Sequence, residues 1–125
     1  MSGVKSILVV NDSLFERLAL SRLVERFGYT AVAAASGVEA LDLVEECTFD
    51  LVLLALVMPL LNGFEVLTQM RKRSELAHMP IVVMAGPGSG EELQCRLAGA
   101  DQFLPWPLDA LALGECLKNC LEKDG

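Results

Sequence analysis

Few side chains in this sequence are of the types that act as nucleophiles or bind metals. The chain has one histidine, His78, in a predicted loop, and four cysteines in predicted helices, at positions 47, 95, 116 and 120. Cys116 and Cys120 stand four residues apart and offer two thiolate ligands at most, with no histidine nearby. The pattern favours buried, reduced thiols over a metal site, and a lone loop histidine is more often solvated than catalytic.

A second group of polar residues lies in predicted loops. Asn11, Asp12 and Ser13 follow the first apolar segment, and Asp12 or Ser13 can cap the next helix. Residues 86–90, Gly-Pro-Gly-Ser-Gly, join a strand to a helix and in principle could hold an anion at the helix N-terminus. This segment lacks the Gly-Lys-Ser/Thr ending of a P-loop and the spacing of a dinucleotide fingerprint, so we interpret it as a flexible connection.

The element that must position any site is the apolar segment 51–55, Leu-Val-Leu-Leu-Ala. Its five apolar residues lack the alternation of a half-exposed strand, which predicts a parallel strand covered by helices on both faces. A loop containing Pro59 and the turn Asn62-Gly63 follows it. In open parallel sheets the chemistry lies just beyond the carboxyl ends of the strands. The residue at that end is Ala55, which carries no reactive group.

Composition limits the class of protein. The chain has 125 residues, 53% of them hydrophobic, which predicts a single domain, 1–125, whose core needs neither disulfides nor metal. A net charge of -7 argues against a nucleic-acid-binding surface. The basic trio 71–73, Arg-Lys-Arg, is predicted to be a solvated helix C-terminus. No apolar run is long enough to span a bilayer and no leader pattern is present, so we expect a cytoplasmic protein without membrane or nucleic-acid partners.

Five strand-helix units follow one another along the chain. The predicted strands are 5–10, 30–34, 51–55, 81–84 and 102–104. The predicted helices are one from Ser13 to about Phe27, one marked by Ala40, Leu41 and Val44, two at about 64–73 and 91–97, and a last one capped by Asp109. This alternation predicts a doubly wound, five-stranded parallel sheet with right-handed crossovers and helices on both faces, a three-layer α/β/α fold.

Taken together, several segments resemble the receiver domains of two-component response regulators, from Lys5 to Leu121. They are Ile7-Leu8-Val9-Val10-Asn11-Asp12-Ser13, Leu53-Leu54-Ala55-Leu56-Val57-Met58-Pro59 with Asn62-Gly63, Pro80-Ile81-Val82-Val83-Met84, Ala98-Gly99-Ala100-Asp101 and Pro105-Trp106-Pro107. The resemblance implies a flavodoxin-like (βα)5 fold and a role in bacterial two-component, or phosphorelay, signalling. In that family a histidine kinase transfers a phosphoryl group to an aspartate that ends the third strand.

The resemblance also assigns a role to each position of the family's phosphorylation site. Two acidic residues after the first strand hold Mg²⁺, a Ser/Thr after the fourth strand binds the phosphoryl oxygens, and a lysine after the fifth strand pairs with the group. This sequence has Asn11 and Asp12 for the acidic pair, Ala55 for the aspartate, Ala85 for the hydroxyl and Trp106 for the lysine. Among these positions only Asp12 keeps the family's residue type.

These replacements remove the chemistry that the family needs. The methyl group of Ala55 is not a nucleophile and cannot form an acyl phosphate. With Asn11 and Ala55 in place of two carboxylates, little remains to hold Mg²⁺. An indole at Trp106 avoids the cost of a buried lysine without a partner. We therefore expect no cofactor and no metal; Asp12 is at most a weak residual Mg²⁺ ligand, and otherwise a capping or hydrated carboxylate.

Two aromatic residues carry further expectations. Trp106 lies between two prolines, and it either fills the vacated pocket or forms an exposed anchor for a partner. Phe103 matches the aromatic position that, in active members of the family, changes rotamer when the Ser/Thr moves. Because Ala85 has no hydroxyl, we expect Phe103 to keep one packing.

The first hypothesis is a pseudo-receiver, a phosphorylation-independent protein-interaction module without enzymatic activity that binds a kinase or an output protein or domain. The resemblance places its contact surface, and that of a homodimer, on the fourth helix, fifth strand and fifth helix, with candidates Glu92, Gln94, Arg96, Gln102, Phe103, Trp106, Glu115 and Lys118. The alternative is a sensor that binds a nucleotide, flavin or metabolite in the remodelled pocket, because related doubly wound sheets bind flavin at that end. A receiver phosphorylated on another carboxylate is the third hypothesis.

Overall fold

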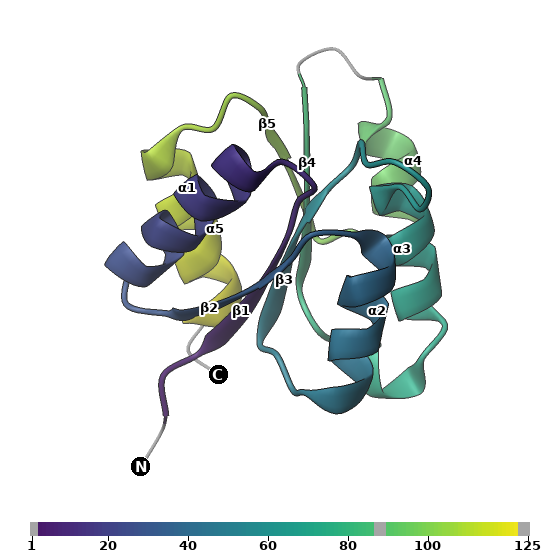
Figure 1. Ribbon diagram of the computed structural model, residues 1–125, viewed down its shortest axis with the longest axis horizontal. Coiled ribbons are helices and arrows are strands. Elements are labelled where there is room, and N and C mark those ends of the chain that lie inside the picture. The colour runs from purple at the N-terminus through teal and green to yellow at the C-terminus, as the bar shows by residue number, and fades with distance from the viewer. Residues whose placement is uncertain (1–2, 87–89, 123–125) are drawn as a thin grey trace.

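The computed structural model describes residues 3–86 and 90–122, and strands alternate with helices along them (Figure 1). The strands are β1 (Ser6–Val10), β2 (Thr30–Ala34), β3 (Leu51–Ala55), β4 (Ile81–Ala85) and β5 (Gln102–Pro105). The helices are α1 (Leu14–Arg26), α2 (Gly37–Glu46), α3 (Gly63–Arg71), α4 (Glu92–Leu97) and α5 (Ala110–Leu121), with a short 3-10 helix, η1 (Ser74–Leu76). The predicted alternation is confirmed, and η1 was not predicted.

The strands form one parallel sheet in the order β2-β1-β3-β4-β5. Helices α1 and α5 cover one face, and α2, α3 and α4 cover the other (Figure 1). The predicted flavodoxin-like, doubly wound α/β fold is therefore confirmed. Because β3 pairs with β1 on one side and β4 on the other, Ala55 lies in register with Met84 at the carboxyl edge of the sheet.

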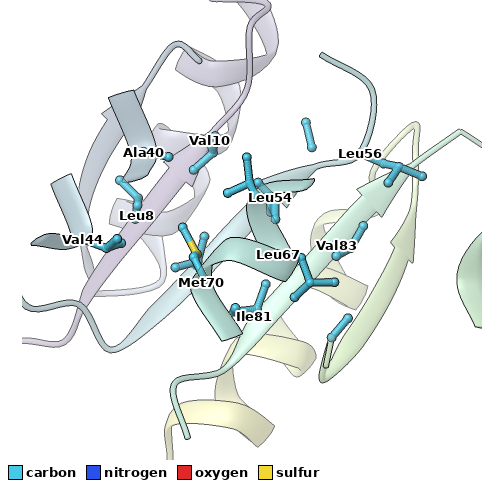
Figure 2. Packing of buried hydrophobic residues seen from close by; sticks show 14 of the residues in the cluster. Leu8, Val10, Ala40, Val44, Leu54, Leu56, Leu67, Met70, Ile81 and Val83 are labelled. Atoms are coloured by element: carbon cyan, nitrogen blue, oxygen red, sulfur yellow. The ribbon is translucent and has the colours of Figure 1, made fainter. Parts of the chain in front are cut away.

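Two apolar cores hold the layers together. Alternate residues of a strand point to opposite faces, so Leu8 joins the core under α2, α3 and α4, while Ile7 joins the core under α1 and α5. Every residue of β3 is buried, as predicted for a strand covered on both faces. Figure 2 shows Leu67 and Met70 of α3 among the side chains that pack over the sheet near Leu54. Each fully buried leucine contributes roughly 2 kcal/mol to folding.

Polar side chains define where the helices begin. The Ser13 hydroxyl accepts the Glu16 backbone N–H at 3.3 Å and caps α1. At the start of α3, the Asn62 side chain accepts the Glu65 N–H at 2.9 Å and the Glu65 carboxylate accepts the Asn62 N–H at 2.9 Å. Asp109 caps α5, as predicted. Caps of this kind contribute about 1 kcal/mol each and fix the direction in which each helix leaves the sheet.

The prediction of a solvated basic helix end is wrong for Arg71. Its side chain is only 15% exposed and pairs with the Asp101 carboxylate at 2.9 Å. The guanidinium also donates to the carbonyls of Gly99 and Leu76, at 3.0 and 2.7 Å. The physical reason is that the end of α3 packs against the turn before β5, which supplies these acceptors. Arg71 is thus a structural tie between α3, η1 and that turn.

The expectation of buried thiols is wrong for Cys47 and holds only in part for Cys120, which is half-buried. Cys47 is exposed because it ends α2 as its C-cap, whereas Cys95 and Cys116 are buried. Burial and the neighbouring Cys120 raise the pKa of Cys116 to about 12, so this thiol stays protonated near neutral pH. Among the described residues no cluster of three metal-ligating side chains occurs. Within the same residues, no helix has the length and apolar character needed to cross a bilayer.

Candidate functional site

A cleft of about 300 Å³ opens at the carboxyl edge of the sheet, the upper edge in Figure 1. Residues that follow or end β1, β3, β4 and β5 line it, together with the first turn of α1. They are Asn11, Asp12, Ser13, Glu16, Ala55, Val57, Met84, Ala85, Gly86 and Trp106. All five positions that the sequence assigned to the family's phosphorylation site therefore lie around one cleft.

Asn11 is the buried polar residue of the cleft, with 4% of its surface exposed. Its side-chain oxygen accepts the Ser13 N–H at 2.8 Å, and its Nδ2 donates to Oε1 of Glu16 at 3.1 Å. An aspartate at this position would face the Glu16 carboxylate at hydrogen-bond distance with like charge. The amide of Asn11 therefore suits the glutamate beside it.

Sequence reasoning missed Glu16 as a residue of the cleft. The spacing of Ser13 and Glu16 is that of a capping box, which could have drawn attention to it. Glu16 lies in the first turn of α1, and its carboxylate accepts a hydrogen bond from the Asn11 side chain. The cleft thus has a carboxylate from α1, in addition to that of Asp12, which follows β1.

Asp12 is exposed at the mouth of the cleft. The alternative that it caps α1 is wrong, because Ser13 occupies the N-cap. Within residues 3–86 and 90–122, its carboxylate has neither a hydrogen bond nor an ion pair. Asp12 is therefore a solvated carboxylate that faces the cleft without a protein partner in the described part of the chain.

Two methyl groups line the inner part of the cleft. Ala55 and Ala85 end neighbouring strands and are 8% and 5% exposed. The backbone around them is held closely, since the Leu56 N–H donates to Met84 O at 2.9 Å and the Gly63 N–H donates to Leu56 O at 2.7 Å. A β-carbon on Gly63 would lie 2.2 Å from the Ala55 carbonyl oxygen. The start of α3 therefore packs so closely against the end of β3 that position 63 has no room for a side chain.

Trp106 forms one wall of the cleft. Its backbone N–H donates to Ala85 O at 2.7 Å, which extends the pairing of β5 with β4. The half-buried indole packs against the core under α1 and α5 and also lines the cleft. It therefore combines features of both alternatives: part of the ring is packed, and a cleft remains open beside it.

Phe103 does not line this cleft. Its half-buried ring packs against the other core, under α2, α3 and α4. The loop 86–90, which we interpreted as a flexible connection, includes residues 87–89, which lie outside the described residues. His78 is exposed in the loop after η1.

The charge on the cleft lining is negative. Asp12 and Glu16 contribute two carboxylates, and among the residues that the structure describes no lysine, arginine or histidine belongs to the lining. Arg17 is close in sequence, but its guanidinium donates to the Asn11 backbone carbonyl at 2.8 Å and is not part of the lining. Such a lining repels phosphate and attracts cations.

The candidate contact surface around β5 is largely exposed. Glu92, Gln94, Arg96, Gln102, Glu115 and Lys118 are exposed, and Phe103 and Trp106 are half-buried. On α4, Arg96 forms an ion pair with Glu92 at 2.9 Å, so each of these two charges already has a partner within the helix.

Two leucines on α4 were missed as candidates for this surface. Leu93 and Leu97 are 68% and 79% exposed. They stand four residues apart, so they share one face of the helix. Cys95, midway between them, is fully buried. A helix cannot bury positions 93, 95 and 97 together, so the sequence signals that α4 leaves apolar side chains exposed on one side, but not on which side.

Comparisons with known proteins agree with one another. Residues 7–118 match the family described as the response regulator receiver domain. The chain is 31% identical over 118 residues to the polar-differentiation response regulator DivK of Brucella ovis, covering 94% of this chain and 96% of the relative. The chemotaxis protein CheY4 of Vibrio cholerae superposes with a TM-score of 0.89 at 29% identity, over 95% of this chain and 100% of that one. A CheY-like receiver domain protein of Methanospirillum hungatei superposes with a TM-score of 0.88 at 29% identity, over 96% and 95%.

Proposed function

The chain belongs to the response regulator receiver family, and from this premise we propose that it is a pseudo-receiver, a module that binds a protein partner in two-component signalling without being phosphorylated. Receiver domains are signalling domains, so the partner is a kinase or an output protein or domain of the same pathway. The module carries no enzymatic activity and needs no cofactor.

The observation that carries this proposal is the methyl group of Ala55. It ends β3 and lines the cleft with 8% of its surface exposed, where the family resemblance expects the phosphoryl-accepting aspartate. Acyl phosphate formation requires a carboxylate nucleophile, and a methyl group cannot supply one. The neighbouring Ala85 offers no hydroxyl, and Trp106 offers no cation to stabilise a transferred phosphoryl group.

Acetyl phosphate is expected to leave the chain unmodified. In the presence of Mg²⁺, intact-mass measurement should find no phosphorylated species, while a receiver domain that keeps its aspartate is modified under the same conditions. The reason is that Ala55 stands in place of the family's aspartate and Trp106 in place of the lysine that pairs with the phosphoryl group. A phosphorylated species would contradict the proposal, and an Asp12→Asn variant would then show whether the exposed Asp12 is the acceptor.

The binding surface of the proposed module is the outward face of α4 together with β5 and α5. Leu93 and Leu97 are the apolar residues that α4 leaves exposed on this side. Exposed apolar residues inside a polar surround are typical of protein contact sites. The charged residues Glu92 and Arg96 flank them and already pair with each other, so their desolvation on binding is partly compensated.

A homodimer through this face is expected to depend on the two leucines. The double variant Leu93→Glu/Leu97→Glu should weaken self-association by about tenfold or more, because two apolar side chains would lose their buried contacts and gain charge. Sedimentation equilibrium over a concentration series measures this, with Val38→Glu on α2, 56% exposed, as the control. A dimer that survives the double variant would place the interface elsewhere, and a monomer at every concentration would contradict the homodimer.

The sensor hypothesis is less well supported by the lining of the cleft. A volume of about 300 Å³ falls at the lower end of the roughly 300–1,000 Å³ typical of small-molecule sites. Nucleotides and flavin nucleotides carry phosphates, which the carboxylates of Asp12 and Glu16 repel. An interaction module is therefore the better supported function.

A further inference from the structure

The cleft has the electrostatic character of a cation site. Two carboxylates line it, and no positively charged side chain of residues 3–86 and 90–122 does. Asp12 has no partner among the residues that the structure describes, and the Glu16 carboxylate accepts one hydrogen bond, from the neutral amide of Asn11. Neither carboxylate forms an ion pair within the described part of the chain, and the nearby guanidinium of Arg17 donates to the Asn11 carbonyl instead. A positively charged group that enters the cleft would be attracted by both carboxylates.

The wall of the cleft adds an aromatic surface. The indole of Trp106 lines the same cleft as the two carboxylates. Indole is the aromatic group that attracts cations most strongly over its face, and the attraction grows when water is excluded. The methyl groups of Ala55 and Ala85 provide apolar contact for an aliphatic stem. Carboxylates, indole and methyl groups together match a lysine or arginine side chain, which has an apolar stem and a charged head.

Exposed apolar residues in the segments that line the cleft favour a cation that belongs to a protein. Val57 lines the cleft with 77% of its surface exposed and also lines an adjacent hollow of about 200 Å³. Leu60, in the same loop, is 99% exposed and adopts a left-handed backbone conformation with a φ of 68°. Leu14 and Phe15 directly follow the cleft residue Ser13 and are 61% and 87% exposed. A free cation would not contact such residues, whereas the apolar residues of a protein would.

We propose that the cleft is a socket for one lysine or arginine side chain of a protein partner, whose neighbouring apolar residues pack on Val57 and Leu60. The inference rests on the proposed function, because a cleft that does not take up phosphate is free to bind a protein side chain. It adds to that function the chemistry by which one partner is recognised. The socket lies at the carboxyl edge of the sheet and is separate from the outward face of α4.

A positional-scanning peptide library tests the socket directly. Peptides with one fixed residue among mixed flanking residues are titrated into the full chain, and the fluorescence of Trp106, the single tryptophan, reports on the cleft. We expect lysine or arginine to be selected at one position, with apolar residues selected beside it. Peptides in which norleucine or glutamine replaces the selected basic residue should bind about tenfold or more weakly.

Matched charge variants separate a local effect from a change in net charge. The double variant Asp12→Asn/Glu16→Gln removes both cleft carboxylates, and the introduced amide oxygen at position 16 can still accept the bond from Asn11. We expect it to weaken the selected peptide about tenfold or more. The control Asp42→Asn/Glu46→Gln makes the same two changes, with the same spacing, at exposed positions of α2 and should leave affinity unchanged. Thermal unfolding of both variants verifies that the fold is kept.

Several outcomes would overturn the socket. Selection of acidic or phosphorylated residues, or no selection at any position, would contradict it. Equal loss of peptide affinity in the two double variants would show that the loss arises from net charge and not from the cleft carboxylates. Saturation of the Trp106 signal by spermidine or Mg²⁺ alone, at concentrations similar to those of the peptide, would assign the cleft to free cations. The acetyl phosphate measurement is independent, so a failed socket and a phosphorylated chain give different results.

Discussion

Arg71→Ala is expected to lower the free energy of unfolding by about 3 kcal/mol, because it removes three hydrogen bonds of a largely buried cation. The guanidinium reaches the carbonyls of Gly99 and Leu76 and the carboxylate of Asp101 at 2.7–3.0 Å. The same Asp101 oxygen accepts the N–H of Ile81 at the start of β4. Loss of Arg71 therefore leaves acceptors unsatisfied in the region where α3, η1 and the turn before β5 meet. Urea denaturation followed by circular dichroism measures the change.

Arg73→Ala is the matched control for this effect. Arg73 pairs with Glu45 at 3.2 Å, but the two side chains are 28% and 59% exposed. Solvent screens such a pair, so we expect its loss to cost less than about 1 kcal/mol. If the two alanine variants were equally stable, the assignment of Arg71 as a structural tie would be wrong. Arg71→Lys should recover only part of the loss, because an ammonium cannot reproduce the planar fork of the guanidinium.

Gly63→Ala is expected to destabilise the fold by about 3 kcal/mol or more, since the added methyl group meets backbone that cannot move aside. The β-carbon would lie 2.2 Å from Ala55 O and 2.7 Å from the α-carbon of Leu56. Relief requires α3 to move away from the end of β3, which would also break the bond from Gly63 N–H to Leu56 O. Thermal and urea unfolding report the loss of stability.

Gly86→Ala is the control for the glycine substitution. Gly86 follows β4 and lines the same cleft, but a β-carbon there meets no atom of the described residues within 4 Å. Its φ also lies outside the left-handed region, so we expect a change within about 1 kcal/mol. Comparable destabilisation by the two alanines would show that the contact at the end of β3 is not what requires glycine at position 63.

The two destabilising variants act at opposite edges of the sheet, and only Gly63 adjoins the cleft. Gly63 holds the end of β3, where Ala55 lies, and Arg71 holds α3 against the turn before β5. Both interactions are independent of phosphate or metal. If the chain is a pseudo-receiver, as we propose, the contact at Gly63 keeps the carboxyl edge of the sheet in place without the ion pairs that a phosphorylated receiver would form there. The contacts of Arg71 fix the opposite, amino edge, where β4 begins.

The order of elements could be predicted from the sequence because the patterns that specify it are local. The five buried residues of β3 form one apolar run, and Ser13 and Asp109 cap the helices that follow them. Strand-helix alternation then restricts the topology to a parallel, doubly wound sheet. The carboxyl ends of such strands meet at one edge, so the five cleft positions predicted by family resemblance could be expected to lie together.

What only the tertiary structure decided depends on contacts between residues far apart in sequence. Arg71 looked like part of a solvated helix end, and its partner Asp101 is thirty residues away. The exposure of Leu93 and Leu97 depends on which side of α4 faces the sheet, which a short helix with apolar residues on several sides does not specify. The second negative charge in the cleft comes from Glu16, whose carboxylate reaches the strand end because Ser13 sets the start of α1. Local hydrophobic pattern determined the fold, whereas packing determined which side chains are buried, paired or left to face the cleft.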